Sequence, residues 1–192
     1  MPSARGRPRS ESSRCAILET ALRLARTKGY VQITMDGIAA EANVGKQTIY
    51  RWWPSKAAVV LEALRENARV EIETPDCGSL QTDLEYFFNS TFAVARRRRG
   101  IDQVLRAMMA EAQYDVEFAK EFRRYVIEPR RAVLFDILER GRARGEVGPN
   151  ANPTLLVDAA FGVMWYRLLA DVGEINEKLA KELAILLAKG SE

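Results

Sequence analysis

An all-α fold is predicted by three features of this 192-residue sequence. Apolar residues recur at helical spacing in almost every segment. No run of four or more residues alternates polar and apolar positions with the β-branched enrichment of a strand. Glycine, asparagine and proline separate the periodic segments at positions where helices end. We expect about nine helices, with a three-helix helix-turn-helix domain at the N-terminus followed by a C-terminal helical bundle.

The first helix is expected to follow a short basic segment. Residues 1–11, MPSARGRPRSE, have no apolar periodicity and predict a disordered arm. The helix-turn-helix domain then occupies residues 12–56. Its first helix ends at Gly29, which can adopt a left-handed cap. This helix buries one apolar face, made of Ile17, Leu18, Ala21, Leu22 and Ala25.

The second and third helices are short and close together in the sequence. Thr34 is placed to cap the second helix, and Asn43 follows it at a position that tolerates a left-handed turn residue. The third helix starts near Gly45 and ends before Pro54, because the residue preceding a proline is driven out of the helical region. The three or four residues between these helices match the connection of a helix-turn-helix.

A fourth helix, at about 55–73 and capped by Ser55, is expected to bridge to a C-terminal domain over residues 74–192. The turn cluster TPDCGS at 74–79 marks the boundary. Five further helices are predicted, at Leu80–Arg98, Ile101–Gln113, Asp115–Arg144 with a bend or break at Pro129, Thr154–Asp171 and Asn176–Lys189.

Composition argues against several enzyme classes. The sequence has no histidine, so it can build no Ser-His-Asp or Cys-His nucleophile and no HExxH site. Cys15 and Cys77 match no metal-ligand spacing and are expected to be ordinary thiols. No phosphate-cradling or dinucleotide-binding motif is present. We expect no catalytic site, metal or cofactor, and a helical enzyme that uses carboxylates is the distant alternative.

Charge is unevenly distributed along the chain. Residues 1–56 hold ten basic and four acidic residues, an excess of six, so the total net charge of +3 leaves −3 for residues 57–192. Such asymmetry indicates a polyanionic partner for the first segment. No apolar stretch approaches the roughly 18 residues of a membrane span, and no signal peptide is visible, so a cytoplasmic protein is expected.

The third helix is predicted to have two different faces. Ile49 and Trp53 stand at i, i+4 spacing and are expected to pack inward. The remaining positions then turn outward, namely Gln47, Thr48, Arg51 and Trp52. A recognition helix of this kind presents its N-terminal residues to base edges in the major groove of DNA.

Residues 33–64, ITMDGIAAEANVGKQTIYRWWPSKAAVVLEAL, resemble the DNA-binding domain of the TetR/AcrR family of transcriptional regulators. The resemblance rests on a threonine that opens the second helix, an Ile-Ala pair, a Thr-Ile-Tyr core, an aromatic residue and a Pro-Ser-Lys start to the fourth helix. These are Thr34, Ile38, Ala39, Thr48, Ile49, Tyr50, Trp53, Pro54, Ser55 and Lys56. Two positions depart from the family pattern, since Asn43 stands where glycine is common and Gly45 where serine is common.

The resemblance and the outward face of the third helix imply double-stranded DNA as a partner. Gln47 suits adenine, Lys46 or Arg51 suits guanine, and helix N-termini suit phosphate. DNA contacts are expected from Thr34, Gly45, Lys46, Gln47, Thr48, Tyr50, Arg51, Trp52, Ser55 and Lys56. The RGRPR segment also resembles the core of an AT-hook, which predicts minor-groove contacts by Arg5, Arg7 and Arg9; a solvated tail is the alternative.

The C-terminal half is expected to bind an effector and to form a homodimer, as the family resemblance implies. Apolar pocket walls are expected from Phe88, Phe92, Met108, Met109, Phe122 and Trp165, although helical spacing alone also places such residues in a plain core. A dimer interface is expected on the last two helices, at Leu156, Ala159, Val163, Leu179, Leu183 and Leu186.

The predicted function is a repressor that binds a palindromic operator as a homodimer and is released by a small, mostly apolar ligand. One short recognition helix reads only a few base pairs, and a two-fold dimer doubles that reading. A ligand-independent or activating regulator of the same fold is the alternative.

Overall fold

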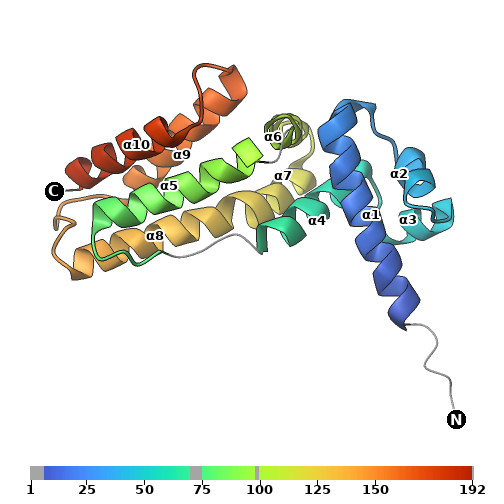
Figure 1. The fold of residues 1–192 in the computed structure, drawn as a ribbon, viewed down its shortest axis with the longest axis horizontal. Helices are drawn as coiled ribbons and strands as arrows, with labels where there is room; N and C mark the ends of the chain where they lie inside the picture. The colour runs from blue at the N-terminus through green and yellow to red at the C-terminus, as the bar shows by residue number, and fades with distance from the viewer. Residues whose placement is uncertain (1–6, 70–74, 98–99, 192) are drawn as a thin grey trace, which may run out of the picture. The chain divides into compact units, whose positions relative to one another are not determined.

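The computed structural model describes residues 7–69, 75–97 and 100–191, and these ranges contain only helices, turns and loops. The all-α prediction is therefore confirmed. The chain forms two compact units (Figure 1). The first, hereafter the N-terminal unit, comprises residues 1–69 and 103–125. The second, hereafter the bundle unit, comprises residues 70–102 and 126–192.

The N-terminal unit is built around a pair of packed helices, α1 and α4. Its elements are α1 (Arg7–Lys28), the 3₁₀ turn η1 (Tyr30–Gln32), α2 (Met35–Glu41), α3 (Lys46–Trp52), α4 (Lys56–Arg69), most of α6 (Ile101–Glu111) and α7 (Val116–Phe122). Helix α1 packs along α4, and α2 packs against both α1 and α3 (Figure 1). The predicted apolar face of α1 is buried at Ile17, Leu18, Ala21, Leu22 and Ala25.

The turns of this unit follow the local sequence signals. Gly29 ends α1 with a positive φ of 87° and an extended ψ of 141°, a conformation that favours glycine, and Asn43 follows α2 with φ 54° in the left-handed region. The Thr34 hydroxyl accepts a hydrogen bond from the Gly37 N–H at 3.0 Å and so caps α2. At the start of α4, the Ser55 hydroxyl accepts from the Ala58 N–H at 3.2 Å. The turn at Asn43 and the caps at Thr34 and Ser55 are confirmed, whereas Gly29 ends α1 with a positive φ but outside the αL conformation of a left-handed cap.

Helix α1 begins earlier than the sequence predicted. Its first residue is Arg7, so the expectation of disorder over residues 1–11 is wrong for residues 7–11. Pro8 lies in the first turn, where the missing N–H of proline costs no helical hydrogen bond. The helical backbone at Arg7 and Arg9 contradicts the extended form on which the minor-groove prediction rests, whereas Arg5 lies outside the described residues.

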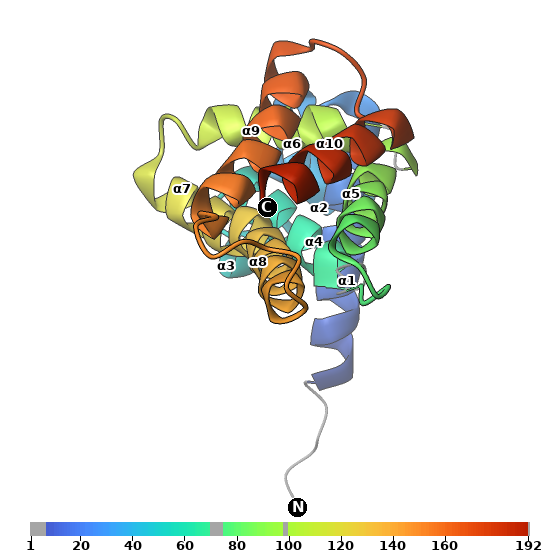
Figure 2. The same cartoon turned by 90° about the vertical axis from the view of Figure 1, so that its left-hand side faces the viewer.

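The bundle unit packs four helices around one apolar core. They are α5 (Leu80–Arg97), α8 (Glu128–Ala143), α9 (Pro153–Ala170) and α10 (Glu177–Gly190). Helix α10 lies along α5, α5 lies against α8, and α9 contacts both α8 and α10 (Figures 1 and 2). Within the described ranges, no helix is long and apolar enough to cross a membrane.

A π-helical turn, η2 (Arg123–Ile127), separates α7 from α8. The sequence predicted one helix over 115–144 with a bend or break at Pro129, and the interruption falls just before that proline. Pro129 has no N–H to offer the carbonyl of Tyr125, and its ring crowds the same carbonyl. A widened helical turn relieves that conflict.

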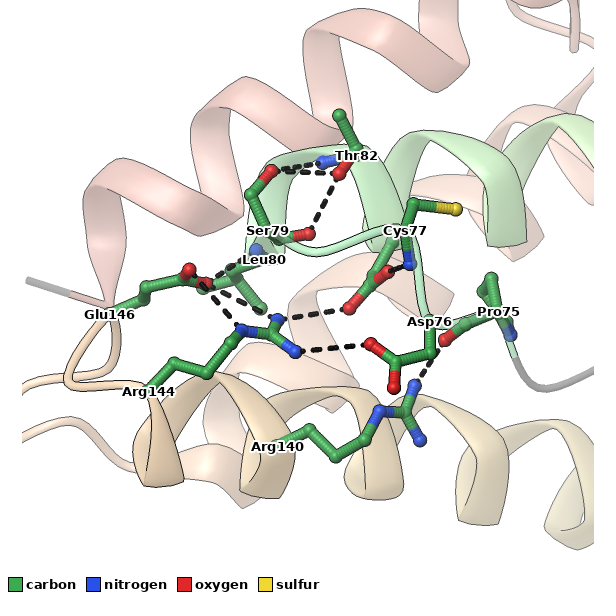
Figure 3. Close-up of polar contacts among 10 residues, drawn as sticks. Pro75, Asp76, Cys77, Ser79, Leu80, Thr82, Arg140, Arg144 and Glu146 are labelled. Atoms are coloured by element: carbon green, nitrogen blue, oxygen red, sulfur yellow. Dashed lines mark hydrogen bonds and ion pairs between the residues drawn. The ribbon is translucent and has the colours of Figure 1, made fainter.

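A polar cluster fixes the start of α5 to the end of α8 (Figure 3). The Asp83 carboxylate is fully buried, accepts the Cys77 N–H at 2.5 Å and lies 2.9 Å from Nη2 of Arg144. Glu146 accepts the N–H of Leu80 at 2.5 Å, so the first turn of α5 is capped from a distant segment. These carboxylates therefore join segments more than 60 residues apart within the bundle unit.

The two compact units divide the chain at other positions than the predicted domain boundary at residue 74, which stays a prediction. Helix α4 ends at Arg69, and the rest of the predicted span to residue 73 lies outside the described residues. Residues 103–125, which were expected in the C-terminal domain, belong to the N-terminal unit. The reason is packing, because α7 contacts α4 and buries Phe118 and Phe122.

Candidate nucleic-acid interface

Helix α3 has the two faces that its sequence predicts. Ile49 and Trp53 are buried, at 0% and 4% exposure. Tyr50 is 53% exposed, and Lys46, Gln47 and Arg51 are exposed beside it, while Thr48 and Trp52 are half-buried. The outward face thus carries donors, acceptors and positive charge on a helix whose inward face is fixed.

Glu62 on α4 holds the inward face in place. The Trp53 indole N–H donates to Oε2 of Glu62 at 2.5 Å. The Arg14 guanidinium donates to Oε1 of the same carboxylate through Nε at 2.9 Å and through Nη2. One carboxylate therefore joins α1, α4 and the end of α3. A buried indole N–H needs an acceptor, so Trp53 signals that such a partner exists, but nothing in the sequence identifies Glu62.

The two neighbouring tryptophans pack against each other. Their ring centroids lie 5.5 Å apart with planes at 83°, an edge-to-face arrangement. The guanidinium of Arg51 lies 5.5 Å from the centroid of the Trp52 ring. Trp52 is thereby ordered on both sides at the boundary between the buried and exposed faces of α3.

Lys46, the first residue of α3, pairs with Asp36 on α2. Its Nζ lies 2.6 Å from Oδ2 of Asp36, and both side chains are largely exposed. The hydrogen bond to Asp36, followed by the charge of that carboxylate, raises the pKa of Lys46. The pair sets the direction of Lys46 beside the proposed DNA face, a partnership that sequence analysis missed.

Lys56 is engaged by the chain itself. Its ammonium donates to the carbonyls of Tyr30, Val31 and Ile33 at 3.0, 3.2 and 3.2 Å. It also lies 4.6 Å from the centroid of the Tyr30 ring. An ammonium has three N–H donors, so these carbonyls match its full capacity. Lys56, predicted as a phosphate contact, thus ties the η1 turn to the start of α4.

The remaining predicted contacts lie at helix starts. The hydroxyls of Thr34 and Ser55 are used as N-caps, so what they offer a phosphate is the neighbouring main-chain N–H groups. Gly45, the N-cap of α3, makes no side-chain cap hydrogen bond. The missing hydroxyl at position 45 leaves the first N–H groups of α3 uncapped by a side chain.

Tyr30 links η1 to the end of α6 within the same unit. Its hydroxyl donates to Oε2 of Glu111 at 3.3 Å, and the residue is only 5% exposed. Burial raises the pKa of Tyr30, and the charge and hydrogen bond of Glu111 raise it further. The phenol is therefore held in its neutral form, in which it can donate.

The residues predicted for an effector pocket fall in both units. Phe88 and Phe92 are buried in the bundle core, and Trp165 packs against that core. Met108 and Phe122 are buried in the N-terminal unit, where Met109 is half-buried. A pocket shared by these residues stays a prediction.

The predicted dimer stripe is corrected in part. Leu179 and Leu183 are buried in the core of the bundle unit, and Leu156 and Val163 pack against that core. Placing Leu179 and Leu183 at an interface is wrong because this stripe of α10 is buried against its own bundle, with α10 lying along α5. Leu156 and Val163 on α9 are only partly buried, and their interface role stays a prediction. Two of the predicted residues, Ala159 and Leu186, are exposed.

Two family models match the chain. One, described as "Bacterial regulatory proteins, tetR family", matches residues 17–63, which include α2 and α3. The other, "Tetracyclin repressor-like, C-terminal domain", matches residues 74–187. Both describe regulators, and neither indicates a catalytic activity.

Known proteins resemble the chain over most of its length. An uncharacterised HTH-type transcriptional regulator of Bacillus subtilis, YdeS, is 34% identical over 99% of this chain and 95% of its own. The DNA-binding transcriptional repressor TetR of Mycobacteroides abscessus is 31% identical over 83% of this chain and 84% of its own. The Bacillus subtilis regulator FadR, solved in complex with stearoyl-CoA, shares the fold at a TM-score of 0.75 and 19% identity, covering 93% of this chain and 99% of its own.

The family matches cover the helices that the structure identifies as the helix-turn-helix and the bundle. The helix-turn-helix formed by α2 and α3 lies inside the matched N-terminal segment, with its basic outward face on α3. The second match covers α5 to α9 and most of α10. The chain belongs to the TetR family and is a DNA-binding transcriptional regulator.

Proposed function

We propose that this regulator is a repressor that binds a palindromic operator as a homodimer and is released by a small, mostly apolar effector. The observation that carries the proposal is the divided surface of α3, in which Ile49 and Trp53 anchor the helix while Lys46, Gln47 and Arg51 are exposed. Because its target is DNA, the protein acts in the cytoplasm.

Sequence reading is assigned to the exposed side chains near the start of α3. Gln47 can make a bidentate pair with adenine, and Lys46 or Arg51 can pair with guanine. The Thr48 side chain can contact a thymine methyl group. Each good bidentate pair discriminates against the wrong base by about 1–3 kcal/mol.

Backbone contacts are assigned to the flanks of that surface. Tyr50 offers an exposed hydroxyl and Trp52 an indole edge to sugar and phosphate. Main-chain N–H groups at the start of α4, next to Ser55, offer a further phosphate contact. We leave Lys56 out of this set because its ammonium is bound to three carbonyls.

Helix α9 supports the homodimer. Five of its exposed positions form a stripe at i, i+4, i+7, i+11 and i+14 spacing, made of Leu155, Ala159, Gly162, Tyr166 and Leu169. Leu155 and Tyr166 are each 64% exposed, and Leu186 on α10 is 62% exposed. Small residues in the middle of the stripe allow a second copy of α9 to approach closely across a two-fold axis. Ala159 and Leu186 thus keep their proposed interface role.

The proposals of repression and of release by a ligand are supported by what two similar proteins are named or bind. The Mycobacteroides abscessus relative is a repressor by name, and the structure of FadR holds stearoyl-CoA. A mostly apolar effector fits the aromatic and methionine residues predicted for the pocket. An effector that prefers a conformation with displaced recognition helices weakens DNA binding by the same factor by which DNA weakens effector binding.

Binding to the DNA upstream of its own gene, measured by fluorescence anisotropy across a salt series, tests the proposal. Selective binding with a steep salt dependence is expected. Gln47→Ala should change which bases are preferred, whereas Tyr50→Phe should weaken all duplexes about equally. Equal affinity for every duplex would rule out operator recognition. If analytical ultracentrifugation showed only a monomer, the homodimer would be ruled out.

A thermal-shift screen distinguishes the ligand-released repressor from a ligand-independent regulator. An apolar compound at 100 times its dissociation constant stabilises a protein by about 2.7 kcal/mol. A compound that shifts the unfolding temperature and releases the operator supports the proposal. A compound that strengthens operator binding would instead contradict release by a ligand.

A further inference from the structure

A cleft opens within the N-terminal unit, beside the C-terminal end of the recognition helix. It has a volume of about 410 Å³ and lies between the end of α3, α4 and α7. Its apolar walls include Trp53, Leu61 and Phe118. Small-molecule sites occupy about 300–1,000 Å³, so the cleft is large enough for a small organic ligand.

The polar groups of the cleft are mainly acidic. Its walls include the carboxylates of Glu62, Asp115, Glu117 and Glu121 against the single guanidinium of Arg65. Arg14 pairs with Glu62, and Lys120 pairs with Glu117 at 2.7 Å. Asp115 caps α7 by accepting the Phe118 N–H.

Glu121 is a carboxylate of the cleft that a ligand can pair with. It makes no hydrogen bond or ion pair with any residue that the structure describes, and it is exposed on α7. Asp115 likewise has no cationic partner among those residues. The lining therefore holds more carboxylates than guanidiniums, and two of those carboxylates make no ion pair with a described residue.

Two rings at the edge of the cleft already face cations. The guanidinium of Arg65 lies 4.5 Å from the centroid of Tyr125, and that of Arg124 lies 5.3 Å away. Trp52 faces Arg51 in the same way. Ring faces attract positive charge, most strongly at tryptophan and tyrosine. The cleft thus combines an apolar floor, electron-rich rings and unpaired carboxylates.

We propose that this cleft binds a small organic cation with an aromatic or apolar body, and that its occupation weakens DNA binding. The cation would place its charge toward Glu121 and Asp115 and its apolar body against Trp52 and Phe118. The second half of the proposal rests on the proposed function, because Trp52 is also assigned to the DNA backbone. A ligand that packs on Trp52 contacts the ring that is assigned to the DNA backbone, so the ligand and DNA each weaken the binding of the other.

Isothermal titration calorimetry of the full chain with tetraphenylphosphonium tests the site. Tetraphenylborate has nearly the same size and shape with the opposite charge, and is the matched control probe. We expect the cation to bind and the anion not to bind. Glu121→Gln should lower the affinity for the cation by about fivefold to tenfold, since partial exposure to water screens the lost attraction. Tyr125→Leu should lower it by a similar factor.

Glu182→Gln, which changes an exposed carboxylate on α10, is the matched control variant and should leave the affinity unchanged. No binding of the cation, equal binding of the anion, or equal affinity in the Glu121→Gln and Glu182→Gln proteins would each overturn the site.

Operator binding in the presence of tetraphenylphosphonium tests the coupling. The cation should weaken operator binding in the wild-type protein and should do so less in Glu121→Gln. Calorimetric binding without any change in operator affinity would overturn the coupling and leave the site standing. Failure to find any selectively bound duplex would instead count against the proposed function, because the calorimetric experiment contains no DNA.

Discussion

Asp83 in the bundle unit and Glu62 in the N-terminal unit have the same kinds of partner in different surroundings. Each carboxylate accepts an N–H group and pairs with an arginine. Asp83 is fully buried, whereas the side chain of Glu62 is 26% exposed. Asp83 joins the start of α5 to the end of α8 within the bundle unit. Glu62 instead orients the end of a helix that must meet DNA.

The difference in exposure separates a role in stability from a role in orientation. A buried charge that loses its partner cannot be rescued by water, so removing half of a buried pair is expensive. A half-exposed pair is screened, and its loss costs less free energy. The position of Trp53, however, depends on Glu62 directly. We therefore expect changes at Asp83 to act on unfolding and changes at Glu62 to act on recognition.

Asp83→Ala is expected to have the largest effect. It leaves the Cys77 N–H without its acceptor and removes the buried partner of Arg144, so the free energy of unfolding should fall by about 3 kcal/mol. Urea denaturation of the variant and of Asp136→Ala, an exposed aspartate on α8, measures this. Equal stability of these two proteins would contradict the assignment.

Glu62→Gln should have a smaller effect on stability and a larger one on DNA selectivity. Glutamine can still accept from Trp53 but carries no charge for Arg14, so the free energy of unfolding should fall by about 1–2 kcal/mol. The ratio of operator affinity to random-duplex affinity should also fall. Glu19→Gln, an exposed position on α1, is the control. A stability loss without a change in that ratio would reduce Glu62 to a purely structural residue.

Tyr30→Phe should alter the dependence of stability on alkaline pH. The folded protein raises the pKa of Tyr30, so its contribution is fully present below the ordinary pKa of about 10. Above that pH the unfolded chain loses the proton first, and the contribution declines as pH rises further. Between about pH 9 and about pH 11, the unfolding temperature of the variant should fall by less than that of the wild type. Tyr114→Phe, at a residue 92% exposed, should retain the wild-type dependence.

Asp36→Asn should have the smallest effect on folding and a measurable one on binding. Its pair with Lys46 is exposed, and the unfolding midpoint should not change. If Arg51 rather than Lys46 pairs with guanine, release of Lys46 lets it neutralise a phosphate, so binding to all duplexes should strengthen and the salt slope should steepen by about one. An unchanged slope would show that Lys46 does not reach the DNA backbone.

Local signals made much of the N-terminal unit predictable. The positive φ angles of Gly29 and Asn43 and the cap at Thr34 depend on one or two residues of sequence and little else. The inward positions of Ile49 and Trp53 follow from their spacing. The start of α1 at Arg7 could not be predicted, because a proline is compatible with the first turn of a helix as well as with a disordered segment.

Contacts between distant segments could not be predicted in the same way. Glu62 is 48 residues from Arg14, and Lys56 reaches carbonyls 23 to 26 residues away. Neither pairing leaves a periodic signal. The apolar stripe of α10 could be predicted from the sequence, but its residue pattern is the same whether the helix packs on its own bundle or on a second copy of the chain. The structure shows that Leu179 and Leu183 pack within their own bundle, where α10 lies along α5.

The edge-to-face pair of Trp52 and Trp53 gives the protein an optical property. Indole rings 5.5 Å apart share electronic excitation, which produces a coupled signal in circular dichroism that neither ring gives alone. The third tryptophan, Trp165, lies in the bundle unit. The coupled pair therefore reports on the end of the recognition helix and Trp165 on the bundle. The unlabelled protein carries a separate spectroscopic reporter in each unit.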